Sequence, residues 1–154
     1  MSKETFRSGV LGSFDGLVSV LGIILAAALA GVPSHLLLLT ALGGAVAATV
    51  SMAGGEFLAD PDTEIKHKVR DGLVMGLATF IGSFLPVLPY LVLGSTSALI
   101  TSLCLSLALA ACIAEARASS VPGGRKQAYR ETLTLLIGAS ALAMFVTRLF
   151  GAII

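Results

Sequence analysis

Residues 10–31 read VLGSFDGLVSVLGIILAAALAG, and this stretch decides the fold. A helix needs about 20 mostly apolar residues to cross the hydrocarbon core of a bilayer, and Asp15 is the only charged residue here. Lys3 and Arg7 precede the stretch and Ala28-Leu29-Ala30 resembles a signal-peptidase site. Because the apolar region is long enough to span and Asp15 interrupts it, we predict a retained membrane helix over 10–31.

Four further stretches share this character and predict helices over residues 35–57, 71–93, 96–116 and 129–150. Of the 154 residues 56% are apolar and only 12% charged, whereas soluble domains carry about 25% charged residues. Gly is frequent, and small residues let helices approach closely in lipid. We predict an all-α integral membrane protein, a single domain over 1–154 built as a five-helix transmembrane bundle.

The Lys and Arg residues are distributed unevenly over the predicted connections. With five crossings, the N-terminus, the second-to-third and the fourth-to-fifth connections lie on one side and hold nine of the ten Lys and Arg residues. Arg148 alone lies on the other side. Because positively charged loops stay in the cytoplasm, we predict a cytoplasmic N-terminus and an extracytoplasmic C-terminus.

Several function classes are disfavoured by composition. A net charge of +1 gives no reason to expect a nucleic-acid partner. Cys104 and Cys112 fit no zinc spacing and are interpreted as small apolar residues. His35 and His67 fall on opposite sides of the predicted membrane, and we find no nucleophile–base pair. We therefore expect neither an enzyme nor a permanently bound cofactor.

Asp15 is the most informative residue, because a carboxylate at membrane depth costs roughly 2.5–3.5 kcal/mol on insertion scales and usually faces a cavity, a partner or an ion. The alternative is an interfacial Asp that caps a helix. Ser19 lies one turn further along the same face, and Met52 and Glu56 share a face of the second helix. We predict that Asp15, Met52 and Glu56, with both carboxylates at one depth, form a site for a first-row divalent metal, because carboxylates bind hard or borderline ions and a thioether favours softer ones.

A mildly polar stripe on the third predicted helix consists of Met75, Thr79 and Ser83. It is interpreted either as lining of a pathway or as packing. Pro86 and Pro89 follow, and each proline removes a helical hydrogen-bond donor, which predicts a kink. On the first helix, Gly12 and Gly16 form a Gly-x-x-x-Gly pair, which we predict to lie at a dimer interface.

The remaining acidic groups are interpreted as polar surface. The 58–70 connection carries three acids and His67, and a solvated loop is favoured over a loose metal-capturing segment. Glu115 and Glu131 are expected to be solvated or paired with Arg117 and Arg130.

Three motifs together resemble the vacuolar iron transporter family, in its nodulin-like short form. Residues 13–19 (SFDGLVS) resemble the family's first-helix motif, 51–57 (SMAGGEF) its second-helix motif, and 82–90 (GSFLPVLPY) its proline-rich third helix. The resemblance covers nearly the whole chain. It departs from the family in two places: Phe14 stands where Asn is usual, and the Glu-rich metal-binding insertion between the second and third helices is absent.

The resemblance implies a homodimer, in a cell inner membrane or a vacuolar-type membrane, that exports Fe²⁺, and often Mn²⁺, from the cytoplasm in exchange for protons. It also implies that Asp15, Met52 and Glu56 line the translocation path. The metal is then a transported substrate. The alternative is a non-transporting membrane scaffold or accessory subunit, because small-residue faces serve assembly equally well.

Overall fold

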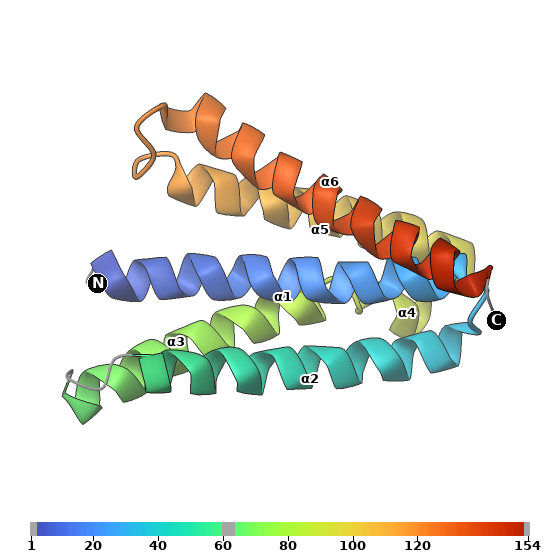
Figure 1. Cartoon of the computed structure of the whole chain (residues 1–154), viewed down its shortest axis with the longest axis horizontal. Helices are drawn as coiled ribbons and strands as arrows, with labels where there is room; N and C mark the ends of the chain where they lie inside the picture. The colour runs from blue at the N-terminus through green and yellow to red at the C-terminus, as the bar shows by residue number, and fades with distance from the viewer. Residues whose placement is uncertain (1–2, 60–63, 153–154) are drawn as a thin grey trace.

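A computed structural model describes residues 3–59 and 64–152 of the chain. Within these residues every regular element is a helix, and Figure 1 shows them packed side by side as a bundle, with α1 beginning and α6 ending at opposite ends. The helices are α1 (Lys3–Leu29), α2 (Ser34–Ala59), α3 (Ile65–Phe84), α4 (Pro89–Val92), α5 (Ser95–Arg117) and α6 (Gly124–Gly151).

Four of the five predicted helices correspond to single helices of the structure, with ends that differ by one to seven residues. The helix predicted over 71–93 is wrong as one element, because α3 ends at Phe84 and α4 begins only at Pro89. The proline nitrogens of Pro86 and Pro89 carry no hydrogen, so neither can continue the i to i−4 hydrogen-bond ladder. Leu85 and Leu88 still donate to the carbonyls of Ile81 and Phe84 at 3.2 Å, so a hydrogen-bonded turn joins α3 to α4 where the kink is predicted.

The connection between α1 and α2 is a tight turn built on a glycine. Gly31 has a φ of +71°, in the left-handed region that favours glycine. The N–H of Val32 donates to the carbonyl of Ala27 at 3.0 Å, and the N–H of Gly31 donates to Ala28 at 3.1 Å. This pair of bonds satisfies two carbonyls at the end of α1 and reverses the chain.

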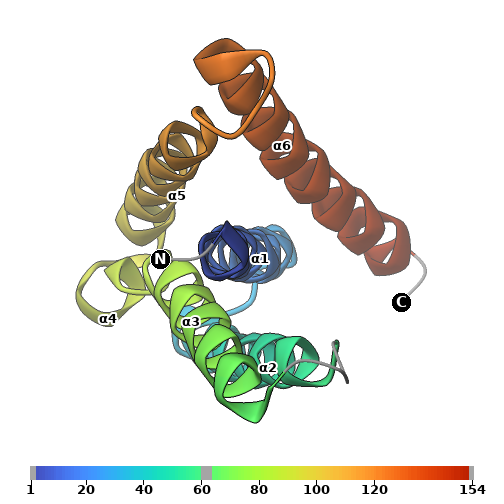
Figure 2. The same ribbon diagram turned by 90° about the vertical axis from the view of Figure 1, so that its left-hand side faces the viewer.

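Helix α1 lies at the centre of the bundle, and Figure 2 shows α2, α3, α5 and α6 around it. Its Val20 and Ile24 are fully buried in a cluster that includes residues of α2, α4 and α5. Leu17 and Leu21 join a second cluster with α5 and α6. The first helix is therefore the element whose side chains every other long helix contacts.

The outer surface of the bundle is apolar. Leu77, Leu142 and Phe145 are among many large apolar side chains that are more than half exposed. Such a surface is stable against lipid tails and not against water. Helices α1, α2, α5 and α6 are each long and apolar enough to cross a membrane. The chain is thus a multi-pass integral membrane protein, and the helix predicted over 71–93 is divided between α3 and α4.

The charged residues gather at one end of this bundle. The start of α1, the start of α3 and the α5–α6 connection meet there, as Figure 1 shows. These are the segments that carry nine of the ten Lys and Arg residues, whereas Arg148 lies near the end of α6. We call this end of the bundle the basic end.

Candidate metal path

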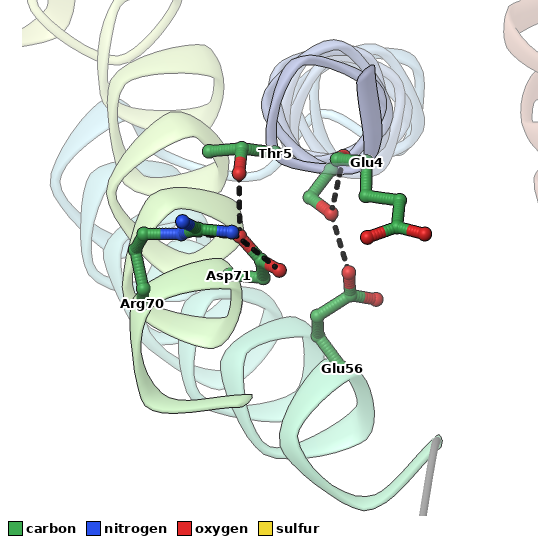
Figure 3. Close-up of polar contacts among 6 residues, drawn as sticks. Glu4, Thr5, Glu56, Arg70 and Asp71 are labelled. Carbon is green, nitrogen blue, oxygen red and sulfur yellow. Dashed lines mark hydrogen bonds and ion pairs between the residues drawn. The ribbon is translucent and has the colours of Figure 1, made fainter. Parts of the chain in front are cut away.

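A hydroxyl–carboxylate contact joins α1 to α2 at the basic end. The Ser8 hydroxyl donates to the Glu56 carboxylate, and also lies 3.1 Å from the carbonyl of Glu4 (Figure 3). Ser8 is buried and Glu56 half-buried. The contact fixes the orientation of the Glu56 carboxylate and leaves part of it accessible for a further ligand.

A second carboxylate lies at the same end on α3. The Thr5 hydroxyl donates to Asp71 at 2.7 Å, and the Arg70 Nε donates to the same Asp71 oxygen at 3.0 Å (Figure 3). Arg70 neutralises this carboxylate, which makes Asp71 a poorer cation ligand than Glu56. Its role is to tie α1 to α3 beside the Glu56 contact.

Asp15 lies on a strip of α1 between α2 and α6. Ser8, Asp15 and Gly22 are seven residues apart and share one face. Ser8 contacts α2 through Glu56, and a side chain at Gly22 would meet Ala143 of α6 at 3.6 Å. Leu11, one turn before Asp15 on this strip, is 48% exposed. Other helices of the chain therefore leave this strip partly uncovered.

Asp15 itself is half-buried and has no hydrogen bond or ion pair within residues 3–59 and 64–152. A capped carboxylate would show a backbone N–H or hydroxyl donor at hydrogen-bond distance. The interfacial-cap alternative therefore finds no support in the described part of the chain.

The prediction that Asp15 and Glu56 lie at one depth is wrong. Glu56 is level with Ser8, and Asp15 lies seven residues further along α1, which corresponds to about 10 Å at 1.5 Å per residue. Helix α2 runs antiparallel to α1, with Gly44 against Ile23. Met52, one turn inward from Glu56, is thus placed between the levels of the two carboxylates.

These three residues are spread along the bundle and do not form one closed site. Within the described residues no group of three or more His, Cys, Asp or Glu side chains is close enough to hold a metal ion together. Glu56, Met52 and Asp15 follow one another from the basic end inward.

The polar stripe of α3 is used for packing. Met75, Thr79 and Ser83 are at most 3% exposed. The Thr79 hydroxyl donates to the Met75 carbonyl at 2.8 Å, and the Ser83 hydroxyl to the Phe80 carbonyl at 3.0 Å. Of the two interpretations of the stripe, the structure supports packing; Ser19 remains half-buried beside Asp15.

The prediction that Gly12 and Gly16 lie at a dimer interface is wrong, because both glycines pack against α3 of the same chain. Both glycines are buried, and a Cβ at Gly16 would overlap the Thr79 carbonyl oxygen and lie 2.9 Å from the Ser83 nitrogen. A Cβ at Gly12 would overlap the Met75 carbonyl oxygen. The pair lets α1 and α3 of one chain touch backbone to backbone, so it is not free to meet a second copy.

The acidic groups of α5 and α6 pair as expected, with one change of partner. Arg117 donates to Glu131 at 3.0 Å, as predicted, whereas Glu115 is bound by Arg125 at 2.6 Å and not by Arg117 or Arg130. Of the 58–70 connection, Asp60, Pro61, Asp62 and Thr63 lie outside the described residues, and Glu64 and His67 are exposed.

Sequence reasoning missed the two hydroxyls that position the carboxylates. Ser8 was detectable, because it is seven residues before Asp15 and therefore on its face. Thr5 and Asp71 carry no such signal, since their contact depends on how α1 and α3 cross.

Comparison with known proteins places this geometry in context. The model of the VIT family matches residues 6–62 and 59–152, nearly the whole chain. A similar protein is vacuolar iron transporter homolog 2 of Oryza sativa subsp. japonica, with 37% identity over 76 residues. That match covers 47% of this chain and 40% of the rice protein, so the chain spans less than half the length of this relative.

Proposed function

This chain belongs to the VIT family, and we propose that it exports a divalent transition metal from the cytoplasm in exchange for protons. The observation that carries the proposal is Asp15, a half-buried carboxylate inside a membrane helix without a partner in the described chain. Placing a charge there costs roughly 2.5–3.5 kcal/mol on insertion scales. Binding of a transported ion by Asp15 would explain why a carboxylate is present at this unfavourable position.

The ligand set favours Fe²⁺, with Mn²⁺ as a second substrate. Carboxylate oxygens of Glu56 and Asp15 bind hard and borderline divalent ions, and the Met52 thioether adds affinity for softer ones. Proton coupling follows from the same carboxylates, because a ligand must lose its proton to bind metal and releases metal when it is protonated. Each transported ion then exchanges for protons at the same oxygens.

We propose that a second copy of the chain packs over the Asp15 strip. A half-exposed carboxylate directly against lipid tails is unfavourable, and Leu11 on the same strip is 48% exposed. Two such strips facing each other across a two-fold axis would enclose the row from Glu56 to Asp15. The homodimer therefore completes the path without the Gly12–Gly16 contact.

Metal uptake into proteoliposomes tests the proposal directly. Purified protein is reconstituted in vesicles with a metal-sensitive dye and a pH-sensitive dye inside. We expect Fe²⁺ to enter, and protons to leave in proportion, only in vesicles that contain protein. Absence of uptake for Fe²⁺, Mn²⁺, Co²⁺ and Zn²⁺ under every imposed pH gradient would favour the scaffold alternative.

Met52→Leu is expected to change metal preference. Leucine keeps the bulk of methionine but removes the sulfur, and loss of a soft ligand weakens binding of softer ions more than that of Mn²⁺. Uptake of Fe²⁺, Co²⁺ and Zn²⁺ should therefore fall relative to Mn²⁺, by about tenfold if the sulfur is a ligand. Met144→Leu, on the exposed surface of α6, is the matched control. Equal loss for all four metals would remove Met52 from the ligand set.

The two termini are expected on opposite sides of the membrane. The nine-to-one partition of Lys and Arg predicts a cytoplasmic basic end, and α6 ends at the other end of the bundle (Figure 1). A reporter active only in the cytoplasm should work at the N-terminus and fail at the C-terminus. Reporters active at both termini would show an even number of crossings.

A further inference from the structure

A basic cavity lies at the surface of the bundle, between the first turns of α1 and the end of α5. It has a volume of about 760 Å³. Three of its lining side chains are cationic, namely Lys3, Arg7 and Arg117. The other lining residues are two hydroxyl residues and two apolar ones, Ser119, Ser120, Phe6 and Val10. The lining thus contains cations and hydroxyl donors and no acidic side chain.

The charge of this cavity is only partly compensated within the chain. Arg117 pairs with Glu131 at 3.0 Å, whereas Lys3 and Arg7 are exposed and form no ion pair with any described residue. Lys3 and Arg7 are four residues apart on one helix face, where like charges repel each other. An anion bound between these cations would relieve that repulsion, so the cavity has the character of an anion site.

An apolar groove continues from this cavity into the membrane region. It has a volume of about 460 Å³ and runs between α1, α3 and α5, the side of α1 that Figure 2 shows flanked by α3 and α5. Phe6 and Val10 line both the cavity and the groove. Deeper in the groove, Leu77, Ile81 and Leu109 replace the charged residues.

The groove has the length of a lipid chain segment. It extends along α1 from Thr5 to Ser13, which is about 12 Å at 1.5 Å per residue. One leaflet of a bilayer has about 15 Å of hydrocarbon. A basic mouth above an apolar furrow of this length is complementary to one molecule that carries a phosphate and an acyl chain.

We propose that this composite site binds an anionic phospholipid, with its phosphate between Lys3, Arg7 and Arg117 and one acyl chain in the groove. Basic pockets between transmembrane helices are a known form of anionic-lipid recognition. Phe6 and Asp15 are nine residues apart, which places them on opposite faces of α1 at 3.6 residues per turn. The lipid therefore lies behind the metal path, and its binding does not depend on the proposed transport.

The headgroup contact is tested with a charge-matched pair of variants. Binding of phosphatidylglycerol and phosphatidylcholine is measured in detergent by native mass spectrometry and by thermal shift. We expect wild-type protein to prefer phosphatidylglycerol. The double variant Lys3→Gln/Arg7→Gln should weaken it about tenfold or more, because two surface cations are lost. Lys66→Gln/Lys68→Gln removes the same charge from α3 and should leave the preference unchanged.

The acyl contact is tested with fluorescence, because the chain contains no Trp. A single Trp is introduced as Leu77→Trp in the groove or as Ile137→Trp on α6, two sites that are each 63% exposed. Limiting phosphatidylglycerol with brominated acyl chains should quench the first Trp and not the second.

Three outcomes would overturn the proposal. One is equal binding of both lipids by wild-type protein. Another is that inorganic phosphate gives the same thermal shift as the lipid while brominated lipid does not quench the groove Trp. This result would indicate a site for a free anion. A third is a groove Trp shielded from brominated lipid in a dimer and exposed to it in a monomer, which would mean that a second copy covers the groove.

Discussion

Asp15→Asn is expected to abolish metal-dependent proton movement and leave the protein folded. Asn keeps the size of Asp and its ability to hydrogen-bond, but removes the charge that binds the metal and the group that takes up a proton. Loss of outer-shell partners alone costs 10–100-fold in metal affinity or activity, so we expect at least a 100-fold loss of uptake. Glu56→Gln should act in the same way, because its amide can still accept the Ser8 hydroxyl but cannot titrate.

We expect the Asp15→Asn variant to fold, because the substitution removes no contact within the described residues. Asp15 has no hydrogen-bond or ion-pair partner in the described residues, so the amide breaks no contact there and avoids the cost of a charge in the membrane. Glu64→Gln, an exposed residue at the basic end, makes the same chemical change as a control. Uptake is measured in proteoliposomes, and folding by elution profile and thermal stability. Wild-type uptake by Asp15→Asn would make Asp15 structural and the scaffold alternative the better explanation.

The helices were predictable from the sequence because their signal is local. A run of about 20 apolar residues has few other interpretations, and the ends of the predicted helices follow from charges and turn residues such as Gly31. The break between Phe84 and Pro89 depends on whether two prolines kink a helix or end it. In membranes, neighbouring helices can satisfy the freed carbonyls, and the local sequence does not specify that environment.

The candidate residues are conspicuous in the sequence, but their relative depth in the bundle was not predictable. A carboxylate such as Asp15 in an apolar helix is conspicuous anywhere, and so is a Met–Glu pair one turn apart. Their relative depth depends on how α2 lies against α1, which is determined by contacts such as Ser8 with Glu56 and Gly44 with Ile23. These contacts join residues more than 20 positions apart in the chain, and no short motif contains them.

The pair of small residues at Gly12 and Gly16 shows a second limit of sequence patterns. Gly-x-x-x-Gly indicates a close helix contact, but the pattern is the same whether the other helix belongs to this chain or to a second copy. The decisive feature is α3, whose Thr79 and Ser83 backbones occupy the space above Gly16. A pattern on one helix contains no information about its partner.

Gly16→Ala is therefore expected to destabilise the single chain. The new methyl group would overlap the Thr79 carbonyl oxygen and lie 2.9 Å from the Ser83 nitrogen, and backbone atoms cannot move aside as a flexible side chain does. Overpacking of a core costs about 1–3 kcal/mol, occasionally more, and 1 kcal/mol corresponds to roughly 2–4 °C in Tm for a chain of similar size. We expect the Tm in detergent to fall by on the order of 5 °C or more, with transport falling through loss of folded protein.

Gly138→Ala is the matched control, because a Cβ at Gly138 on α6 meets no atom within 4 Å. There the methyl group finds open space, and Ala has the higher helix propensity by about 1 kcal/mol. The Tm should stay constant or rise slightly. Oligomeric state is followed for both variants by mass measurement in detergent. If Gly16→Ala retained its Tm but dissociated the homodimer, Gly16 would lie between two copies after all, and the packing of α1 against α3 would have to loosen to make room for the second chain.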